Sequence, residues 1–204
     1  AFNGEPYICR KYDKKCIALK SEDCQTILQN EGDLRNDDTI ILGSVLSITG
    51  GNAANIGTPQ SNAIEMVRQD FHLNSAGIPG IGGKPARPVA WLMCDEVRTG
   101  RDVKGSFAEA LRHLVEDVQV PAFIGPTYSE YVTGAAATTT VPKDVVMFSP
   151  SAQSSSITTL AGNSPTTGAR IVLRTAANDI IYVNTFAGAV QNYFEPTLKK
   201  APPE

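Results

Sequence analysis

The sequence has 204 residues, of which 42% are hydrophobic and 19% are charged, and its formal net charge is −3 at pH 7. This length and composition are typical of a chain that packs one good-sized domain, or one domain and part of a second, and they exclude a disordered protein. Lys and Arg are not clustered, so a nucleic-acid partner is not expected. The sequence also lacks the run of about 18 apolar residues that a membrane-spanning helix needs.

Residues 1–37 are predicted to form a small extension with a character of its own. Residues 6–9 and 16–19 are typical of two short strands joined by a polar turn. Ser21 has the features of a helix N-cap, so a short helix that contains Cys24 is predicted next, followed by a polar linker over 30–38. Such an extension is too small for its own core and needs disulfides or docking to hold it.

The four cysteines predict disulfide bonds. Cys9, Cys16 and Cys24 fall in one lysine-rich stretch, and Cys94 lies far along the chain. This clustering favours disulfides in an oxidising compartment over free thiols, and zinc is disfavoured because no Cys-x-x-Cys or Cys/His pair is present. Four cysteines allow three complete pairings, among which the sequence does not choose. If Cys9 pairs with Cys16, Cys94 would pair with Cys24; the alternative for Cys94 is a buried, small apolar residue.

From residue 39 onward, apolar strands alternate with helices. Strands are predicted over 39–45, 88–93, 121–125, 145–148 and 171–174, and helices over 58–73, 102–118, 129–140 and 178–194. This alternation with short loops predicts an α/β fold, in which a parallel sheet is covered by helices on both faces.

The loops at the carboxyl ends of the strands are the expected binding edge of such a sheet. Three of the four loops carry hydroxyl side chains and backbone N–H groups, and Ser129 stands at a helix start, where an anion is favoured. These features suit a small carboxylate; the alternative is that Ser129 and Asp102 are ordinary N-caps. Asp95 and Glu96 end a strand and are predicted to cap or hydrogen-bond neighbouring loops rather than to act as paired carboxylates.

Motifs for catalysis are missing from the sequence. A serine nucleophile needs a base, but both histidines, His72 and His113, fall in predicted helices beside charged residues and are expected to be solvated. The glycine-rich segment 77–83 follows a helix and precedes a strand, which is the reverse of a dinucleotide-binding motif. We therefore expect no enzyme, no cofactor and no metal.

A series of short motifs carries a family resemblance. They are Ile41-Leu42-Gly43 with Thr49-Gly50, Gly57 and Ala63, Ala76-Gly77-Ile78 with Gly82-Gly83-Lys84, Asp95, Phe123-Ile124-Gly125-Pro126 with Ser129, Phe148-Ser149-Pro150-Ser151-Ala152, and Leu173-Arg174-Thr175 with Asp179. Each motif is weak alone, but their order and spacing are fairly specific. Over residues 38–187 the chain resembles the amino-terminal lobe of type I periplasmic binding proteins, in particular the leucine/isoleucine/valine-binding receptors of ABC transporters.

The resemblance implies a small ligand, an amino acid or a related carboxylate, held between two lobes. Ser129 would bind the ligand's carboxylate or amine, and the loop after residue 148 would contribute backbone and hydroxyl contacts. Gln153 stands where the family often has threonine, and Ile56 stands where it often has an aromatic residue. The residues that the resemblance assigns to ligand binding are Thr127, Tyr128, Ser129, Ser151, Ala152, Gln153 and Ile56.

The resemblance also implies domains and partners. Residues 38–176 would be the first ligand-binding lobe, and 177–204 a helix that crosses toward a second lobe, so the chain is expected to be a fragment. The full-length protein would serve an ABC permease, and the last helix of the fragment is expected to drive dimerisation. We expect a periplasmic or extracellular protein, lipid-anchored through a removed N-terminus. A sensory domain not coupled to transport is the alternative.

Overall fold

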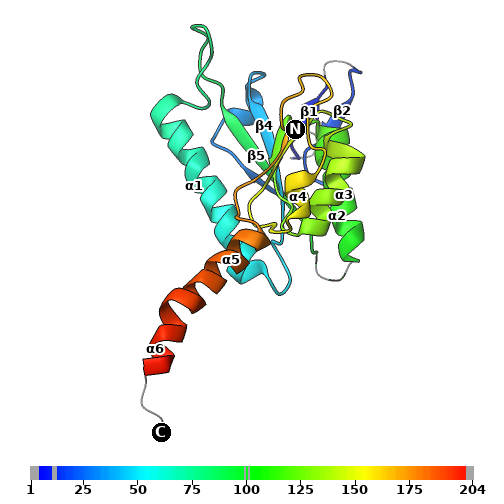
Figure 1. Ribbon diagram of the computed structural model, residues 1–204. Coiled ribbons are helices and arrows are strands. Elements are labelled where there is room, and N and C mark those ends of the chain that lie inside the picture. Colours follow the sequence, from blue (N-terminus) through cyan, green and yellow to red (C-terminus); the bar gives the residue numbers. More distant parts are fainter. Residues whose placement is uncertain (1–4, 11–12, 99, 101, 201–204) are drawn as a thin grey trace.

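The computed structural model describes residues 5–10, 13–98, 100 and 102–200 and shows an α/β fold (Figure 1). Its main sheet has six strands: β3 (Thr26–Leu28), β4 (Ile40–Leu46), β5 (Val89–Asp95), β6 (Ala122–Ile124), β7 (Val146–Ser149) and β8 (Val172–Arg174). The strand order is β3-β5-β4-β6-β7-β8, and every neighbouring pair is parallel except β3 and β5. The predicted fold class is therefore confirmed.

Helices follow the parallel strands. They are α1 (Thr58–Ser75), α2 (Val103–Arg112), α3 (Ser129–Ala135), α4 (Ser156–Thr159), α5 (Asp179–Ala189) and α6 (Glu195–Lys200). Short π-helical segments precede or extend them at Ala53–Gly57, His113–Val118, Ala136–Thr140 and Val190–Phe194, and a 3-10 turn spans Asp33–Arg35. Asp102 caps α2 by accepting from the N–H of Gly105 at 3.1 Å, and Asn178 caps α5 by accepting from the N–H of Ile181 at 2.9 Å. The predicted cap at Asp102 is confirmed, and of the two residues that the sequence offers as the cap of the last helix, Asn178 and Asp179, the cap is Asn178.

The two faces of the sheet differ in how well they are covered. The helices α2, α3 and α4 lie on one face and α1 lies on the other (Figure 1). This follows from the right-handed crossover rule, because the chain moves one way from β4 to β5 and the other way through β6, β7 and β8. The large core, which includes Val45, Leu114 and Phe123, lies on the α2 face, whereas the α1 face has only a small cluster around Leu46, Ile64 and Met93.

The N-terminal segment is tied into the lobe by disulfides. A hairpin of β1 (Tyr7–Cys9) and β2 (Cys16–Ala18) carries the bond Cys9–Cys16, and a second bond joins Cys24 to Cys94 of β5. The predicted bonds and this pairing are confirmed. The short helix predicted around Cys24 is wrong, because the disulfide holds this stretch beside β5 and the next residues form the antiparallel edge strand β3.

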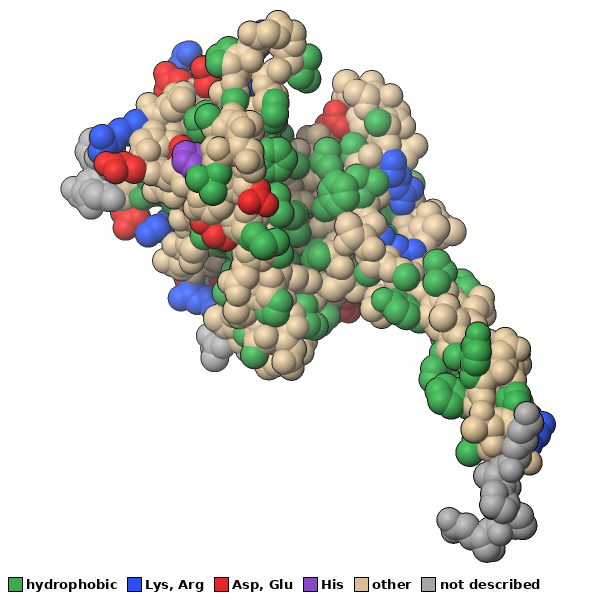
Figure 2. Space-filling view, turned by 90° about the vertical axis from the view of Figure 1, so that its left-hand side faces the viewer, with side chains coloured by type: hydrophobic (Ala, Val, Ile, Leu, Met, Phe, Trp, Pro, Cys, Tyr) green, Lys and Arg blue, Asp and Glu red, His purple; other side chains and the backbone are tan. Residues whose placement is uncertain are grey.

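The C-terminal helical segment stands away from the body of the molecule (Figure 1). None of the residues of α5 or of the following π-helical segment is buried, and Phe186 is 70% exposed. Figure 2 shows the hydrophobic side chains that line this projection. Among the described residues, no helix is both long and apolar enough to cross a membrane.

Candidate functional site

The candidate site is the carboxyl edge of the sheet beside β4. At this strand the order of the sheet changes direction, because β5 is added on one side of β4 and β6 on the other. The first strand of the parallel set, β4, lies between β5 and β6, and the connections that leave β4 and β6 go to opposite faces. In doubly wound sheets this divergence opens a crevice between the two loops. Here the two loops are 47–57, which follows β4, and 125–128, which follows β6, with the loop after β7 beside them.

Close backbone packing shapes both loops. A side chain at Gly57 would put its Cβ 1.8 Å from the carbonyl oxygen of Ser47. Gly125 has φ +119°, and a Cβ there would lie 2.0 Å from the carbonyl oxygen of Val45. Only glycine allows these approaches, so the two positions fix how the loops leave the sheet. The peptide bond between Gly125 and Pro126 is cis.

Asp95 ties the loop after β5 to the loop after β4. Its carboxylate accepts hydrogen bonds from the backbone N–H of Ile48 at 3.1 Å, the hydroxyl of Thr49 at 2.6 Å and the backbone N–H of Val97 at 3.0 Å. The prediction that this residue hydrogen-bonds neighbouring loops is confirmed. Three donors on one carboxylate make this corner of the edge rigid.

Glu96 joins three loops at once. It is fully buried, its Oε1 accepts from the Ser47 hydroxyl at 2.7 Å, and its Oε2 accepts from the backbone N–H of Thr127 at 2.9 Å. Burial raises the pKa of this carboxyl; hydrogen bonds from Thr127 and Ser47 lower it, and the nearby charge of Asp95 raises it. The sequence prediction that Glu96 hydrogen-bonds neighbouring loops is confirmed as well.

The hydroxyl groups predicted at the ligand edge belong to one hydrogen-bonded arrangement. The Ser151 hydroxyl donates to the carbonyl oxygen of Thr127 at 3.2 Å, and the Ser129 hydroxyl accepts from the N–H of Ser154 at 3.1 Å. This leaves the hydrogen of Ser129 free to be donated to a ligand. The structure therefore brings residues 127–129 and Ser151 together at one edge; their role in binding stays a prediction.

The remaining residues predicted to bind the ligand do not present a free polar side chain in the hydrogen-bonded arrangement of Ser129 and Ser151. Ala152 is buried, and its N–H donates to the Ser149 hydroxyl at 3.2 Å, so this N–H is already used within the fold. The side chain of Gln153 is exposed, and its carbonyl oxygen accepts from the N–H of Asp179 at 2.9 Å. Ile56 is half-buried in the π-helical turn before α1.

Asn52 is a site residue that the sequence did not single out. Its side-chain amide donates to the Tyr128 hydroxyl at 2.7 Å and so links the loops after β4 and β6. The sequence shows only that an asparagine stands in a glycine-rich loop at the end of a strand. Asparagine is common in such loops because it stabilises turns, so the sequence alone does not indicate a site residue.

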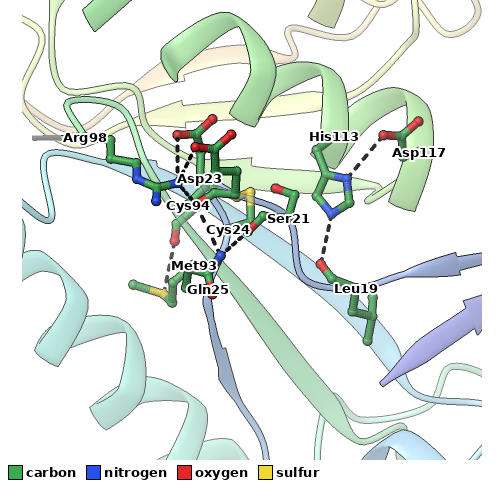
Figure 3. Close-up of a disulfide and its surroundings, with 12 residues drawn as sticks. Leu19, Ser21, Asp23, Cys24, Gln25, Met93, Cys94, Arg98, His113 and Asp117 are labelled. Atoms are coloured by element: carbon green, nitrogen blue, oxygen red, sulfur yellow. Dashed lines mark hydrogen bonds and ion pairs between the residues drawn. A yellow bond between two sulfur atoms is a disulfide. The ribbon is translucent and has the colours of Figure 1, made fainter. Parts of the chain in front are cut away.

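His113 corrects a prediction. It is only 5% exposed, not solvated, with Nε2 2.9 Å from the Leu19 carbonyl oxygen and Nδ1 3.2 Å from the Asp117 carboxylate (Figure 3). The N-terminal segment packs over this part of the helix, a tertiary contact that the local charge pattern did not reveal. His72 is exposed, as predicted.

Cavities elsewhere in the structure surround the N-terminal segment. One of about 790 Å³ lies beside the edge strand β3 and is lined by residues such as Tyr7, Thr26 and Arg35. A smaller cavity of about 180 Å³ reaches Thr49 and Asp95 at the end of the candidate edge. The part of the chain that the structure describes holds no group of three or more His, Cys, Asp or Glu side chains that could bind a metal ion.

Solved structures share this fold, although no protein-family model and no curated protein matches the chain. The substrate-binding protein LivJ of a branched-chain amino acid transporter from Streptococcus pneumoniae, in complex with isoleucine, matches with a TM-score of 0.59 at 19% identity, over 77% of this chain and 39% of its own. The leucine-binding protein LivK of Thermotoga maritima matches with a TM-score of 0.52 at 18% identity, over 76% of this chain and 38% of its own. This chain has the fold of one lobe of type I periplasmic binding proteins.

A third match has an aromatic ligand. It is a solute-binding protein of an ABC transporter from Rhodopseudomonas palustris in complex with 3,4-dihydroxybenzoic acid, with a TM-score of 0.52 at 19% identity, over 77% of this chain and 37% of its own. The lobe-like chain thus spans less than two fifths of the length of each of these three proteins. Isoleucine and 3,4-dihydroxybenzoic acid, the ligands of two of these structures, both carry a carboxyl group.

Proposed function

We propose that the chain is the first ligand-binding lobe of an extracytoplasmic solute-binding protein for an ABC transporter, and that it binds a small amino-acid-like or carboxylate ligand. The main support is the pair of hydroxyl groups of Ser129 and Ser151, which the segments after β6 and β7 bring together at the carboxyl edge of the sheet in a lobe with this fold. The fold alone does not specify function. The proposal therefore depends on the chemistry of the edge.

The edge offers neutral hydrogen-bond donors, and the guanidinium of Arg174 lies against the carbonyl oxygens of Gln153 and Ser154 in the loop after β7. Ser129 has a hydroxyl hydrogen to donate, and Thr127 and Tyr128 precede it along the same edge. Neutral donors of this kind can hold a carboxylate by hydrogen bonds. Ser151, Ala152, Gln153 and Ile56 complete the proposed lining.

The cellular compartment is proposed from the disulfides. Both bonds, Cys9–Cys16 and Cys24–Cys94, form within one chain, and such bonds persist in oxidising compartments. Together with the fold, they support a periplasmic or extracellular location. A lipid anchor at the N-terminal side is part of the same proposal, with the cysteine-containing segment as its spacer.

Two kinds of protein partner belong to the proposal. The first is the ABC permease that a full-length receptor would serve. The second is another copy of this chain, because the helical segment from α5 to α6 exposes large apolar side chains that water does not stabilise. A sensory domain that binds the same ligand without transport remains the alternative function, and neighbouring permease and ATPase genes would distinguish transport from sensing.

Ligand binding is tested by calorimetry and thermal shift with leucine, isoleucine and 4-hydroxybenzoate. At least one should bind, weakly because a single lobe supplies only part of the ligand's contacts. Ser129→Ala should weaken that binding by about tenfold, the usual effect of losing one hydrogen bond to a charged group. Ser75→Ala, at the C-terminal end of α1 and away from the candidate edge, is the matched control and should bind like the parent. If none of the three compounds binds, or if Ser129→Ala binds as tightly as the control, the proposal is wrong.

A further inference from the structure

The most unusual group at the candidate edge is the carboxyl of Glu96. It is 0% exposed, and the hydrogen bonds resolved for it come from neutral donors, the Ser47 hydroxyl and the Thr127 N–H. A buried carboxylate is normally paired with a cation, because burial without one is costly. Here the described surroundings supply hydrogen bonds instead of a positive charge.

The ionisable groups around Glu96 are themselves acidic. Asp95 is its neighbour at the end of β5, and Tyr131 faces it from α3. Desolvation raises the pKa of Tyr131, and the charges of Glu130 and Glu96 raise it further, followed by Tyr128 and Asp102. Any negative charge added to this edge therefore meets other negative charges and favours the neutral form of Glu96.

The geometry connects Glu96 to the proposed ligand contacts through the backbone of a single residue, Thr127. Its Oε2 accepts from the N–H of Thr127 at 2.9 Å, while the carbonyl oxygen of the same residue accepts from the Ser151 hydroxyl at 3.2 Å. The protonated carboxyl can keep both of its contacts, because its O–H can donate to Ser47 while its other oxygen still accepts from Thr127. Protonation thus changes the charge beneath the edge without requiring the loops to move.

We propose that Glu96 is the positioning residue of the ligand edge and that a carboxylate ligand binds there together with a proton taken up by Glu96. The proposal rests on the proposed function, since it needs a ligand whose carboxylate lies toward residues 127–129 and Ser151. The bound carboxylate and an ionised Glu96 would repel each other through the dry interior. Protonation of Glu96 removes this repulsion, so affinity falls as the pH rises.

Calorimetry with each of leucine, isoleucine and 4-hydroxybenzoate that binds tests the linkage between about pH 5.5 and 8.5, a range over which an ordinary carboxylate keeps one charge. Titrations in two buffers of different ionisation enthalpy should show net proton uptake by the parent protein. Its affinity should fall about tenfold across the range, the size expected for two charges several ångströms apart at an effective dielectric constant of ~20–40. Glu96→Gln should bind without proton uptake and with a flat pH profile, whereas the exposed control Glu31→Gln should behave like the parent.

A ligand-free measurement separates this inference from the proposed function. The amide resonance of Thr127 should move with pH in the parent and stay still in Glu96→Gln, because this N–H donates to the titrating carboxyl. If Thr127 titrates but none of leucine, isoleucine and 4-hydroxybenzoate binds, the proposed function and its proton linkage both fail while the Glu96–Thr127 coupling stands. Binding without proton uptake, or equal pH profiles in the parent and Glu96→Gln, would overturn the linkage alone. Should the variant not fold, the two-buffer titration and the Thr127 shift in the parent still decide.

Discussion

At the residue scale, a few buried polar groups hold the loops of the candidate edge together by hydrogen bonds. Asp95 and Glu96 are adjacent, yet they bind different loops, because successive positions at a strand end point in different directions. Sequence patterns identified both as loop-binding residues but could not identify their partners. The partners are Ile48, Ser47 and Thr127, which are distant in the chain and meet only because β4 lies between β5 and β6.

Stability should depend on pH through Glu96. Because burial raises its pKa in the folded state, the native protein holds this proton more tightly than the unfolded chain does. The resulting stabilisation is fully present below the pKa of the unfolded carboxyl and is lost as the pH rises through the folded pKa. Urea unfolding at low and high pH should show this loss in the parent but not in Glu96→Gln. Glu96→Ala should be about 1–3 kcal/mol less stable than Glu96→Gln, because the Thr127 N–H loses its acceptor.

His113 provides a second test at this scale. Its ring lies between the Leu19 carbonyl and the Asp117 carboxylate, so His113→Ala should cost about 1–3 kcal/mol of unfolding free energy and speed hydrogen exchange in β2. His72→Ala is the matched control, since that side chain is exposed. Equal stability of the two variants would show that the ring does not hold the N-terminal segment.

At the scale of elements, the disulfide Cys24–Cys94 determines the edge of the sheet. The strand β3 has only three residues and pairs with β5 just beyond this bond, with Thr26 opposite Met93. Strands this short are poorly predicted from sequence, because their stability comes from the neighbour they pair with and not from their own pattern. The local sequence around Cys24 favours a helix, but the disulfide to Cys94 holds this segment beside β5 in an extended conformation.

Removing each disulfide should have unequal effects. The bond Cys24–Cys94 joins residues 70 apart, whereas Cys9–Cys16 joins residues 7 apart, so the first restricts the unfolded chain more. The double variant C24S/C94S should lose about 2–4 kcal/mol and expose the amides of β3 to rapid hydrogen exchange. The double variant C9S/C16S should lose less and leave β3 protected. A larger loss for the small hairpin would contradict this account.

At the scale of the whole molecule, apolar surface is left uncovered in two places. On the α1 face of the sheet, Phe148 is 40% exposed, although parallel sheets are normally covered on both faces. On the projecting helical segment, no residue from Asp179 to Phe194 is buried (Figure 2). A helix that is apolar on all sides is normally covered by other protein.

Self-association should follow from this surface. In sedimentation experiments the chain is expected to dimerise, and V183E/F186E should shift it toward monomer by placing charges on the apolar helix. The control Gln191→Glu adds a charge to the same helical segment without removing an apolar side chain, and it should change association much less. A monomeric parent protein, or equal association of the two variants, would contradict the prediction.

The sequence by itself determined the alternation of strands and helices, the α/β class, the helix cap at Asp102, and the disulfide-forming character of its cysteines. These features depend on local periodicity and residue chemistry, which the linear chain carries in full. The tertiary structure alone decided the strand order, the edge strand β3, the burial of His113 and the hydrogen-bonded links from Ser47 through Glu96 and Thr127 to Ser151. Each of these depends on residues far apart in the chain, and their contacts exist only once β4 has packed between β5 and β6.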